Sequence, residues 1–348
     1  MMCVGFEGLT VPDSLGRLLD AGVGGVILFA RNVESPEQVR ALTDEIRRRA
    51  PGPVLIGVDQ EGGRVRRLRT GYSQVPSMRD LGKANDPDLV REIGRVLGRE
   101  LRASGFDVDF APVIDVDTNP KNPVIADRSF SSDAQVVATM GVALIEGLQM
   151  EHVAACAKHF PGHGDTSTDS HLTLPRLDHD IERLRRVELL PFVAAVRAGV
   201  MSIMTSHVIF APIDSERPAT LSPVVLDRLL RGEIGYDGLV FSDDMEMKAI
   251  ADHFGFIESI EAAARAGVDV LTVCHNLDKQ WQAIETLAKL PTDVLTRANV
   301  RREVVADRLK DQPRPGLDVL ACAAHLEVVA RVQASIELAD PTERSKWA

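Results

Sequence analysis

Short apolar runs alternate along the chain with longer segments in which apolar residues recur every three or four positions. The short runs cover residues 3–6, 24–29, 53–58, 107–113, 153–158, 201–207, 238–243 and 268–273. A short apolar run is typical of a buried strand, and the longer spacing is typical of an amphipathic helix. Eight strands that alternate with helices predict an α/β fold, a (β/α)₈ barrel of the TIM type.

The ends of the predicted helices carry clear signals. Four glycines end a helical pattern just before an apolar run: Gly22, Gly105, Gly199 and Gly267. Glycine is the preferred residue just after the last turn of a helix. Another helix begins at Ser35 and Pro36, which have the chemistry of an N-cap and a first-turn proline. Both kinds of signal agree with the strand positions above.

A doubly wound open sheet is the structural alternative to a barrel. It is disfavoured because no GxGxxG motif follows the first strand and because polar residues cluster after many strands. We therefore predict a single barrel domain over residues 1–312. Residues 313–348 resume a helical pattern after a Pro-Arg-Pro-Gly segment. They predict a short helical extension that packs on the barrel and frays at its polar end.

Composition narrows the classes of partner. Lys and Arg number 40 against 51 Asp and Glu, and this net charge of −11 disfavours a nucleic-acid partner. No stretch approaches the ~20 apolar residues of a membrane span, and the first residues lack the pattern of a signal peptide. We expect no membrane partner and a cytoplasmic protein. Four widely spaced cysteines predict reduced thiols, and the oligomeric state stays open, a monomer being compatible.

Residues 158–171 concentrate the reactive side chains of the chain. This stretch contains Lys158, His159, His163, Asp165, Asp169 and His171 together with two glycines and a proline. It begins where the predicted strand 153–158 ends, so these groups lie on the loop that follows a barrel strand. Functional groups on a loop that a rigid scaffold positions are the usual layout of an active site.

Polar residues also follow other predicted strands. Asp59 follows the third, Arg128 lies in the long loop after the fourth, His207 follows the sixth and Asp243 ends the seventh. The C-terminal ends of barrel strands meet at one face, so these residues predict one pocket. Taken alone, Asp59 could instead cap a helix, and His207 could be a buried structural histidine.

Two acidic positions need a choice of role. Asp243 and Asp244 are adjacent, and neighbouring strand residues point to opposite sides, so we assign Asp243 to the pocket and Asp244 to the next helix. A carboxylate at a strand end can be a nucleophile, a general base or a metal ligand. Asp169 and His171 form either an acid/base pair or a loop-stabilising hydrogen bond. Histidines are available for zinc, but no compact ligand motif exists, so we predict no metal.

The motifs at residues 57–65, 122–130, 158–171 and 241–245 together resemble glycoside hydrolase family 3. They resemble its β-N-acetylglucosaminidase branch, which acts in peptidoglycan recycling on small carbohydrate substrates. The resemblance implies a retaining exo-acting hydrolase without a cofactor. It implies that Asp243 is the nucleophile and that Asp169 holds His171 as the acid/base. It also implies a sugar-binding set: Asp59, Arg67, Arg128, Lys158 and His159. We add His207 to that set from its place after the sixth strand.

The chain departs from many members of that family in two respects. It ends after the barrel and a short tail, without a second sandwich-type domain, so its loops must complete the pocket. Ala126 stands where glycine is common, a change that we expect to be tolerated unless the position needs a positive φ. Three other functions stay open: a Schiff-base lyase that uses Lys158, a non-catalytic sugar sensor, and a phosphorolytic variant of the glycosidase.

Overall fold

The computed structural model describes residues 1–167 and 174–339, and its centre is a closed barrel of eight parallel strands. The strands are β1 (Met2–Val4), β2 (Gly25–Leu28), β3 (Leu55–Val58), β6 (Val108–Asp109), β7 (Ala154–Phe160), β9 (Ser202–Thr205), β11 (Leu239–Asp244) and β12 (Val270–Val273). The barrel closes where β1 pairs with β12, with Met2 beside Leu271. Each strand coincides with one of the eight predicted apolar runs, which confirms the barrel.

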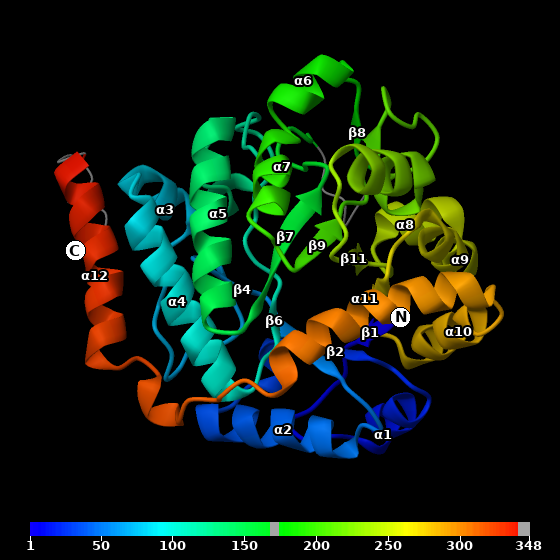
Figure 1. Ribbon diagram of the computed structural model, residues 1–348, viewed down its shortest axis with the longest axis horizontal. Helices are drawn as coiled ribbons and strands as arrows, with labels where there is room; N and C mark the ends of the chain where they lie inside the picture. The colour runs from blue at the N-terminus through cyan, green and yellow to red at the C-terminus, as the bar shows by residue number, and fades with distance from the viewer. Residues whose placement is uncertain (168–173, 340–348) are drawn as a thin grey trace.

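Helices surround the barrel (Figure 1). They are α1 (Asp13–Asp20), α2 (Pro36–Arg49), α3 (Met78–Ala84), α4 (Pro87–Ser104), α5 (Ala134–Met150), α6 (Ile181–Arg186), α7 (Leu190–Arg197), α8 (Lys248–Phe254), α9 (Phe256–Ala266), α10 (Leu277–Leu287), α11 (Thr292–Lys310) and α12 (Ala323–Ala339). Between β9 and β11, a π-helix covers Val224–Glu233. Ser35 caps α2 as predicted, because its side chain accepts a hydrogen bond from the backbone of Gln38. All four predicted boundary glycines have positive φ.

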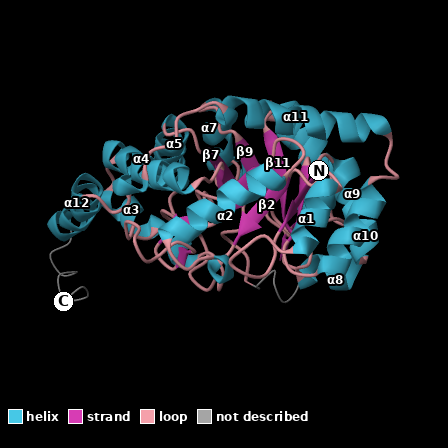
Figure 2. Ribbon diagram, turned by 90° about the horizontal axis from the view of Figure 1, so that it is seen from below, coloured by secondary structure: helices cyan, strands magenta, loops and turns pink. Residues whose placement is uncertain are grey.

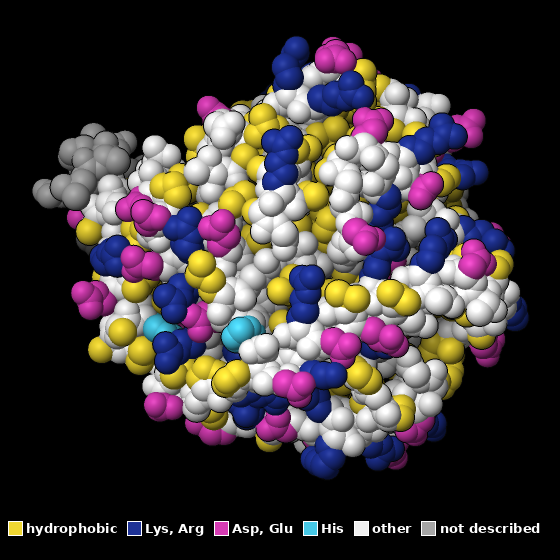
Figure 3. All heavy atoms as spheres, in the orientation of Figure 1, with side chains coloured by type: hydrophobic (Ala, Val, Ile, Leu, Met, Phe, Trp, Pro, Cys, Tyr) yellow, Lys and Arg dark blue, Asp and Glu magenta, His cyan; other side chains and the backbone are white. Residues whose placement is uncertain are grey.

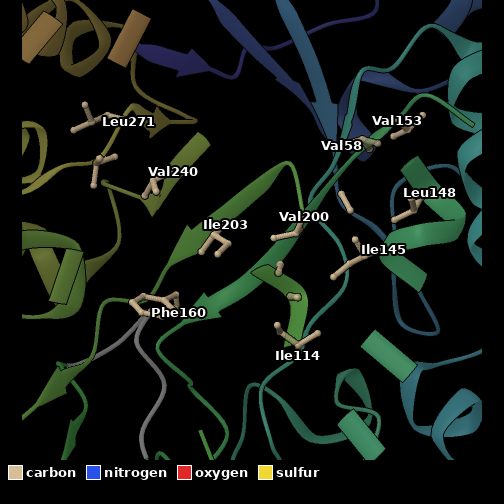
Figure 4. Packing of buried hydrophobic residues seen from close by; sticks show 14 of the residues in the cluster. Val58, Ile114, Ile145, Leu148, Val153, Phe160, Val200, Ile203, Val240 and Leu271 are labelled. Atoms are coloured by element: carbon tan, nitrogen blue, oxygen red, sulfur yellow. The ribbon is translucent and has the colours of Figure 1, made fainter. Parts of the chain in front are cut away.

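Side chains of the barrel strands alternate between two hydrophobic layers. Outward residues such as Val58, Ile203 and Val240 pack with the surrounding helices in one large cluster (Figure 4). Inward residues fill the barrel interior, where the rings of Phe110 and Phe241 meet edge to face with their centroids 5.2 Å apart. The period of two follows from the strand pleat, and the filled interior makes the barrel a packed core and not a pore.

Helix α11 covers the N-terminal end of the barrel. Val305, Ala306 and Leu309 on this helix belong to the same cluster as the inward residues of the strands. Figure 2 shows α11 lying across one end of the strands while long loops gather at the other end. On the face that carries α11, charges of both signs mix with hydrophobic side chains (Figure 3). The loop end is therefore the part of the barrel that can carry a site.

The C-terminal helix α12 packs against α3 and α4. Polar pairs fix it there: His325 bonds to the buried Glu100 at 2.8 Å, and Arg331 forms an ion pair with Glu92. By length and composition alone, the segment Leu317–Glu337 could cross a membrane. This corrects the expectation that no stretch of the chain is long and apolar enough. The segment contains no unbroken run of about 20 apolar residues, but it reaches the required mean hydropathy with charged residues included.

Candidate active site

A cavity of about 280 Å³ lies at the C-terminal ends of the barrel strands. It brings together six of the residues that the sequence analysis selected: Asp59, Arg67, Arg128, Lys158, His159 and Asp243. Its other lining residues are Ile27, Phe29, Glu61, Val65, Val124, His163, Met204, Asp244, Met247, Thr272, Cys274 and His275. The polar groups come from several strands and loops and converge on one space, as barrel geometry predicts.

Glu61 lies at the centre of the charged side of the cavity. Arg128 donates two hydrogen bonds to its carboxylate, each 2.8 Å long, and the Lys158 ammonium lies 2.7 Å from it. The same ammonium donates to Asp59 at 2.9 Å, and the Arg67 guanidinium reaches Asp59 at 3.3 Å. Two carboxylates therefore hold three cations in place. Such an ion-pair network is rigid, and its members cannot move independently.

This ion-pair network sets the pKa values of Glu61 and Lys158. Burial raises the pKa of Glu61, but the charges and hydrogen bonds of Arg128 and Lys158 outweigh burial and hold that pKa below its usual range. Burial lowers the pKa of Lys158, and Asp59 and Glu61 reverse this and raise it above its usual value. Lys158 is thus protonated at neutral pH. Imine formation needs a neutral amine, so the geometry disfavours the Schiff-base lyase.

Asp115 orients the histidine that ends the charged stretch of β7. Its carboxylate is fully buried, lies 2.7 Å from His159 Nδ1 and accepts the backbone N–H groups of His159 and His163. Burial raises the pKa of Asp115, but the neighbouring His159 reverses the effect and lowers it. The ionised carboxylate makes Nδ1 the proton-bearing nitrogen of His159. This fixes the ring and directs Nε2 away from Asp115.

The loop after β7 is held by close backbone packing. A side chain at Gly164 would place its Cβ 1.8 Å from the carbonyl oxygen of Val116, so only glycine fits there. His163 bonds to Thr166 at 2.8 Å. Burial and the neighbouring His159 lower the pKa of His163 to about 4, so this ring is neutral at pH 7. The glycine and proline content of the stretch thus reflects tight packing of residues 161–167.

The loop that carries Arg128 contains a residue in the left-handed region. Ala126 begins the short 3₁₀ helix Ala126–Arg128 and has a φ of 44°. Arg79 of α3 donates to the carbonyl of Ala126 and to that of Ser129, which ties the loop to α3. The position therefore does need the positive φ that the sequence analysis named as its condition. Alanine pays a steric cost there that glycine would not.

Asp243 and Asp244 both line the cavity, which corrects the expectation that Asp244 points to the following helix. The pairing of β11 with β12 changes register between Phe241 and Asp244, so the strict alternation of the strand fails at this point. The backbone N–H of Asp244 donates to Asp243 Oδ1 at 2.8 Å. Asp244 also accepts from the backbone of Glu246, so it retains part of its expected bracing role.

His207 does not line the cavity, which argues against its predicted role in binding sugar. It is fully buried, with Nδ1 2.8 Å from the Thr220 hydroxyl and Nε2 3.0 Å from the backbone carbonyl of Asp244. His207 does follow β9 as predicted, but its side chain lies outside the cavity, behind the residues that line it. It holds the peptide unit that follows Asp244, whose N–H group, on Met245, donates to the carbonyl of Thr272.

Two of the predicted catalytic residues, Asp169 and His171, lie outside the described residues. Their roles, like those of the sugar-binding set, stay predictions. In the part of the chain that the structure describes, no group of three or more His, Cys, Asp or Glu side chains is arranged to hold a metal ion.

Sequence reasoning placed neither of two important carboxylates, Glu61 and Asp115, in the predicted catalytic or sugar-binding sets. Glu61 lies two positions after Asp59 in the same motif, and a spacing of two places side chains on one side of an extended segment. That signal was available. Asp115 follows the fourth barrel strand and could have been found by asking which carboxylate orients His159.

Comparisons with known proteins identify the family of this chain. Residues 4–306 match the family model of the glycosyl hydrolase family 3 N-terminal domain. A protein of Thiobacillus denitrificans named beta-hexosaminidase is 40% identical over 346 residues, which cover 95% of this chain and 94% of that protein.

Two solved structures share the fold. A glycoside hydrolase family 3 beta-N-acetylglucosaminidase from Paenibacillus sp. str. FPU-7 superposes with a TM-score of 0.92 at 39% identity, over 96% of this chain and 67% of that chain. NagZ from Neisseria gonorrhoeae, in complex with N-trifluoroacetyl-D-glucosamine, superposes with a TM-score of 0.83 at 31% identity, over 96% of this chain and 97% of that chain.

Proposed function

The chain belongs to glycosyl hydrolase family 3 and is a glycoside hydrolase, and from this premise we propose that it is a retaining exo-β-N-acetylglucosaminidase. Its substrates are terminal β-linked N-acetylglucosaminides, and peptidoglycan fragments are their source. The observation that carries the proposal is Asp243, a carboxylate at a strand end on the wall of a cavity whose other side holds fixed cations and hydrogen-bonding groups.

In the first step, Asp243 attacks the anomeric carbon and forms a covalent glycosyl intermediate while an acid protonates the departing oxygen. The N–H group of Asp244 donates to Oδ1 of Asp243 at 2.8 Å and helps to orient the carboxylate for this attack. In the second step, water attacks the same carbon and releases the sugar with its original anomeric configuration. The ion-pair network around Glu61 supports this chemistry because it keeps the groups that bind sugar hydroxyls in one geometry during both steps.

The acid/base role goes to His171, with Asp169 as the carboxylate that orients it. This assignment is supported by the resemblance of the 158–171 motif, since both residues lie outside the described ones. Histidine suits the role because its ordinary pKa lies near neutral pH, which lets one ring donate a proton in the first step and accept one in the second.

The substrate class is supported by the names of relatives. One is a beta-N-acetylglucosaminidase, and another was solved with an N-acylated glucosamine. Peptidoglycan fragments as the source rest on the resemblance of the histidine motif alone. Hydrolysis of muropeptides and of chitin oligomers side by side would test it. We also propose that the enzyme acts in the cytoplasm, which cell fractionation would test.

The decisive experiment identifies the nucleophile. Incubation with a 5-fluoro glycosyl fluoride of N-acetylglucosamine should trap the intermediate, and peptide mapping by mass spectrometry should find the added mass on the peptide that contains Asp243. Asp243→Asn should lower kcat on an aryl N-acetylglucosaminide by about a thousandfold or more. NMR of the first-formed sugar should show retained configuration.

The matched control is Asp252→Asn, an exposed carboxylate on α8, which should leave kcat unchanged. Inversion of configuration would contradict the double-displacement mechanism. A label on any other residue would remove Asp243 from the role of nucleophile.

A further inference from the structure

A short antiparallel hairpin carries part of the ion-pair network. Its strands are β4 (Gln60–Gly62) and β5 (Val65–Arg66). Glu61 lies on the first strand, Arg67 directly follows the second, and both line the cavity. The strands are very short, and their register shifts within the pairing. An isolated two-stranded hairpin is only marginally stable, so the pairing alone does not fix the backbone that follows β5.

The side chain of Gln60 supplies hydrogen bonds to that backbone. Its Oε1 accepts the N–H groups of Arg67 and Leu68, each at 3.0 Å, and its Nε2 donates to the carbonyl oxygen of Leu68 at 2.9 Å. A side-chain amide has the donor and the acceptor of a peptide unit, so the Gln60 amide acts here as a neighbouring strand would. Gln60 is 3% exposed and Leu68 is fully buried, and buried backbone groups need such partners.

The backbone of Gln60 is itself fixed to the barrel. Gln60 follows Asp59, which comes directly after β3. Its N–H group donates to Oδ1 of Asp109 on β6 at 3.0 Å, and Asp109 is fully buried. The Gln60 amide therefore links the backbone of Arg67 to two strands of the barrel.

The guanidinium of Arg67 is held more weakly than the other cations of the ion-pair network. Its hydrogen bond to Asp59 is 3.3 Å long, the longest contact in the network, and it lies 5.9 Å from the centroid of the Phe29 ring. Arg128, in contrast, makes two hydrogen bonds of 2.8 Å to Glu61. The place of the Arg67 guanidinium thus depends strongly on where its backbone lies.

We propose that Gln60 is a positioning residue, whose amide holds Arg67 where it binds the substrate. Gln60 is not among the residues that line the cavity, so it acts through Arg67 and not by touching the sugar. An arginine that is already in place loses less conformational entropy when the sugar binds. This inference rests on the proposed function, because the role of Arg67 in binding sugar belongs to that proposal.

The first test replaces Gln60 by methionine, which has a similar length and no amide. On an aryl N-acetylglucosaminide, Gln60→Met should raise KM by about tenfold and lower kcat by less than about threefold, because the lost interaction serves the bound substrate and the transition state alike. A merely structural role would lower kcat per mole of protein through partial unfolding and would leave KM unchanged.

The matched control is Gln74→Ala, in the segment that follows the hairpin. The Gln74 side chain also donates to backbone carbonyls, those of Arg69 and Tyr72, but it is exposed. Its loss should change KM and kcat by less than about twofold.

A double-mutant cycle tests whether Gln60 acts through Arg67. Arg67→Ala should raise KM by about tenfold or more. Adding Gln60→Met to it should raise KM by less than about twofold further, because the side chain that Gln60 positions is already gone. Thermal unfolding shows whether each variant is folded at the assay temperature. If Gln60→Met does not fold, Gln60→Glu, which keeps the acceptor oxygen and loses the donor, takes its place in the same cycle.

Several outcomes would overturn the inference: effects on KM that multiply in the double variant, a fall in kcat with unchanged KM in Gln60→Met, or an unchanged KM in Arg67→Ala. If the wild type does not cleave the aryl N-acetylglucosaminide, the proposed function fails and the inference falls with it. If the wild type cleaves it and the two substitutions act independently, the function stands and only the positioning role is wrong.

Discussion

Two carboxyl groups of the cavity show how partners decide the protonation of a buried acid. Glu61 is 1% exposed and stays ionised, because Arg128 and Lys158 compensate its burial. The carboxylate of Asp244 lies 3.4 Å from Nε2 of His275, whose side chain is 55% exposed, and no Lys or Arg among the described residues forms an ion pair with it. Burial raises the pKa of Asp244 to about 7, and the negative charges of Glu246 and Asp243 add to that increase. Two acids that line one cavity thus have pKa values shifted in opposite directions, that of Glu61 downward and that of Asp244 upward.

The raised pKa of Asp244 predicts how the free energy of unfolding varies with pH. Between about pH 4 and pH 7 the folded protein binds a proton at this site that the unfolded chain has lost, so Asp244 lowers the free energy of unfolding as the pH rises. Asp244→Asn removes that loss and keeps an acceptor for the backbone of Glu246. We expect it to raise stability at pH 8 by on the order of 2 kcal/mol and to change it little at pH 4.

Thermal unfolding of both proteins at the two pH values measures the effect. Asp252→Asn, on the surface of α8, serves as the control and should show no such pH dependence. A stabilisation of equal size at both pH values would contradict the titration of Asp244 in this range.

Ala126 carries a second prediction at this scale. Its positive φ is costly for any residue with a Cβ, so Ala126→Gly should raise the free energy of unfolding by up to about 1 kcal/mol. The control is Ala134→Gly in the first turn of α5, where helical geometry makes glycine unfavourable and the change should destabilise. Urea unfolding of the two variants measures both effects, and destabilisation by Ala126→Gly would contradict the strain.

Among the elements, α11 stands out because it closes the barrel instead of packing around it. Leu309 on this helix is 2% exposed and belongs to the cluster that fills the barrel interior. Its backbone carbonyl also accepts a hydrogen bond from the buried Arg102 of α4. The helix therefore contributes to the core at the end of the barrel opposite the cavity, where it affects stability more than chemistry.

Leu309→Ala should separate these two properties. The loss of buried methyl groups and the cavity that remains should lower the free energy of unfolding by about 2–4 kcal/mol. The kcat/KM of the folded enzyme at 25 °C should stay within about twofold of the wild type, because the site is at the other end. Val304→Ala on the same helix is the control: Val304 is 49% exposed, so its loss should cost little. A large fall in kcat/KM for Leu309→Ala would show that the two ends are coupled.

The elements also show how far sequence reasoning reaches. Strands and helix ends are local, and an apolar run or a boundary glycine such as Gly267 identifies them directly. The prediction that Asp244 points to the following helix was wrong, because the direction of its side chain depends on a register shift between β11 and β12. The simple alternation of side chains along a strand does not reveal such a shift. The hydrogen bond of the buried His207 to Thr220 joins residues 13 positions apart, which no local pattern of the sequence reveals. The pairing of Phe29 with His275 joins nearly opposite ends of the chain.

For the molecule as a whole, the attachment of α12 decides how the tail behaves. Glu100 of α4 accepts hydrogen bonds from His325 and from the backbone of Ala321, and it is only 4% exposed. On α12 itself, Val332 and Ile336 are buried. Val332 and Ile336 thus pack against the rest of the protein, whereas Leu326 of the same helix is 48% exposed. The length and composition of the segment would also suit a membrane.

We therefore expect the full-length protein to stay in the supernatant when it is centrifuged with vesicles of mixed zwitterionic and anionic lipid. The apolar side chains Val332 and Ile336 are already covered. Release of α12 would expose them and would break the hydrogen bond between His325 and Glu100, which would keep its bonds from Ser73. Quantitative sedimentation over a range of lipid concentrations is the measurement. Pelleting of the protein with the vesicles would show that α12 leaves the barrel.

The position of α11 bears on how substrate enters the cavity and how products leave it. Because side chains fill the barrel interior and α11 covers its far end, reactant and products share one entrance. For the exo-acting hydrolase proposed above, an oligomer that has lost its terminal sugar cannot move further into the protein, and the released sugar lies beneath the shortened oligomer at the mouth of the cavity. The shortened oligomer must depart first, the free sugar second, and only then can another end enter. Trimming is thus distributive: early in digestion, a long oligomer should yield a ladder of all intermediate lengths.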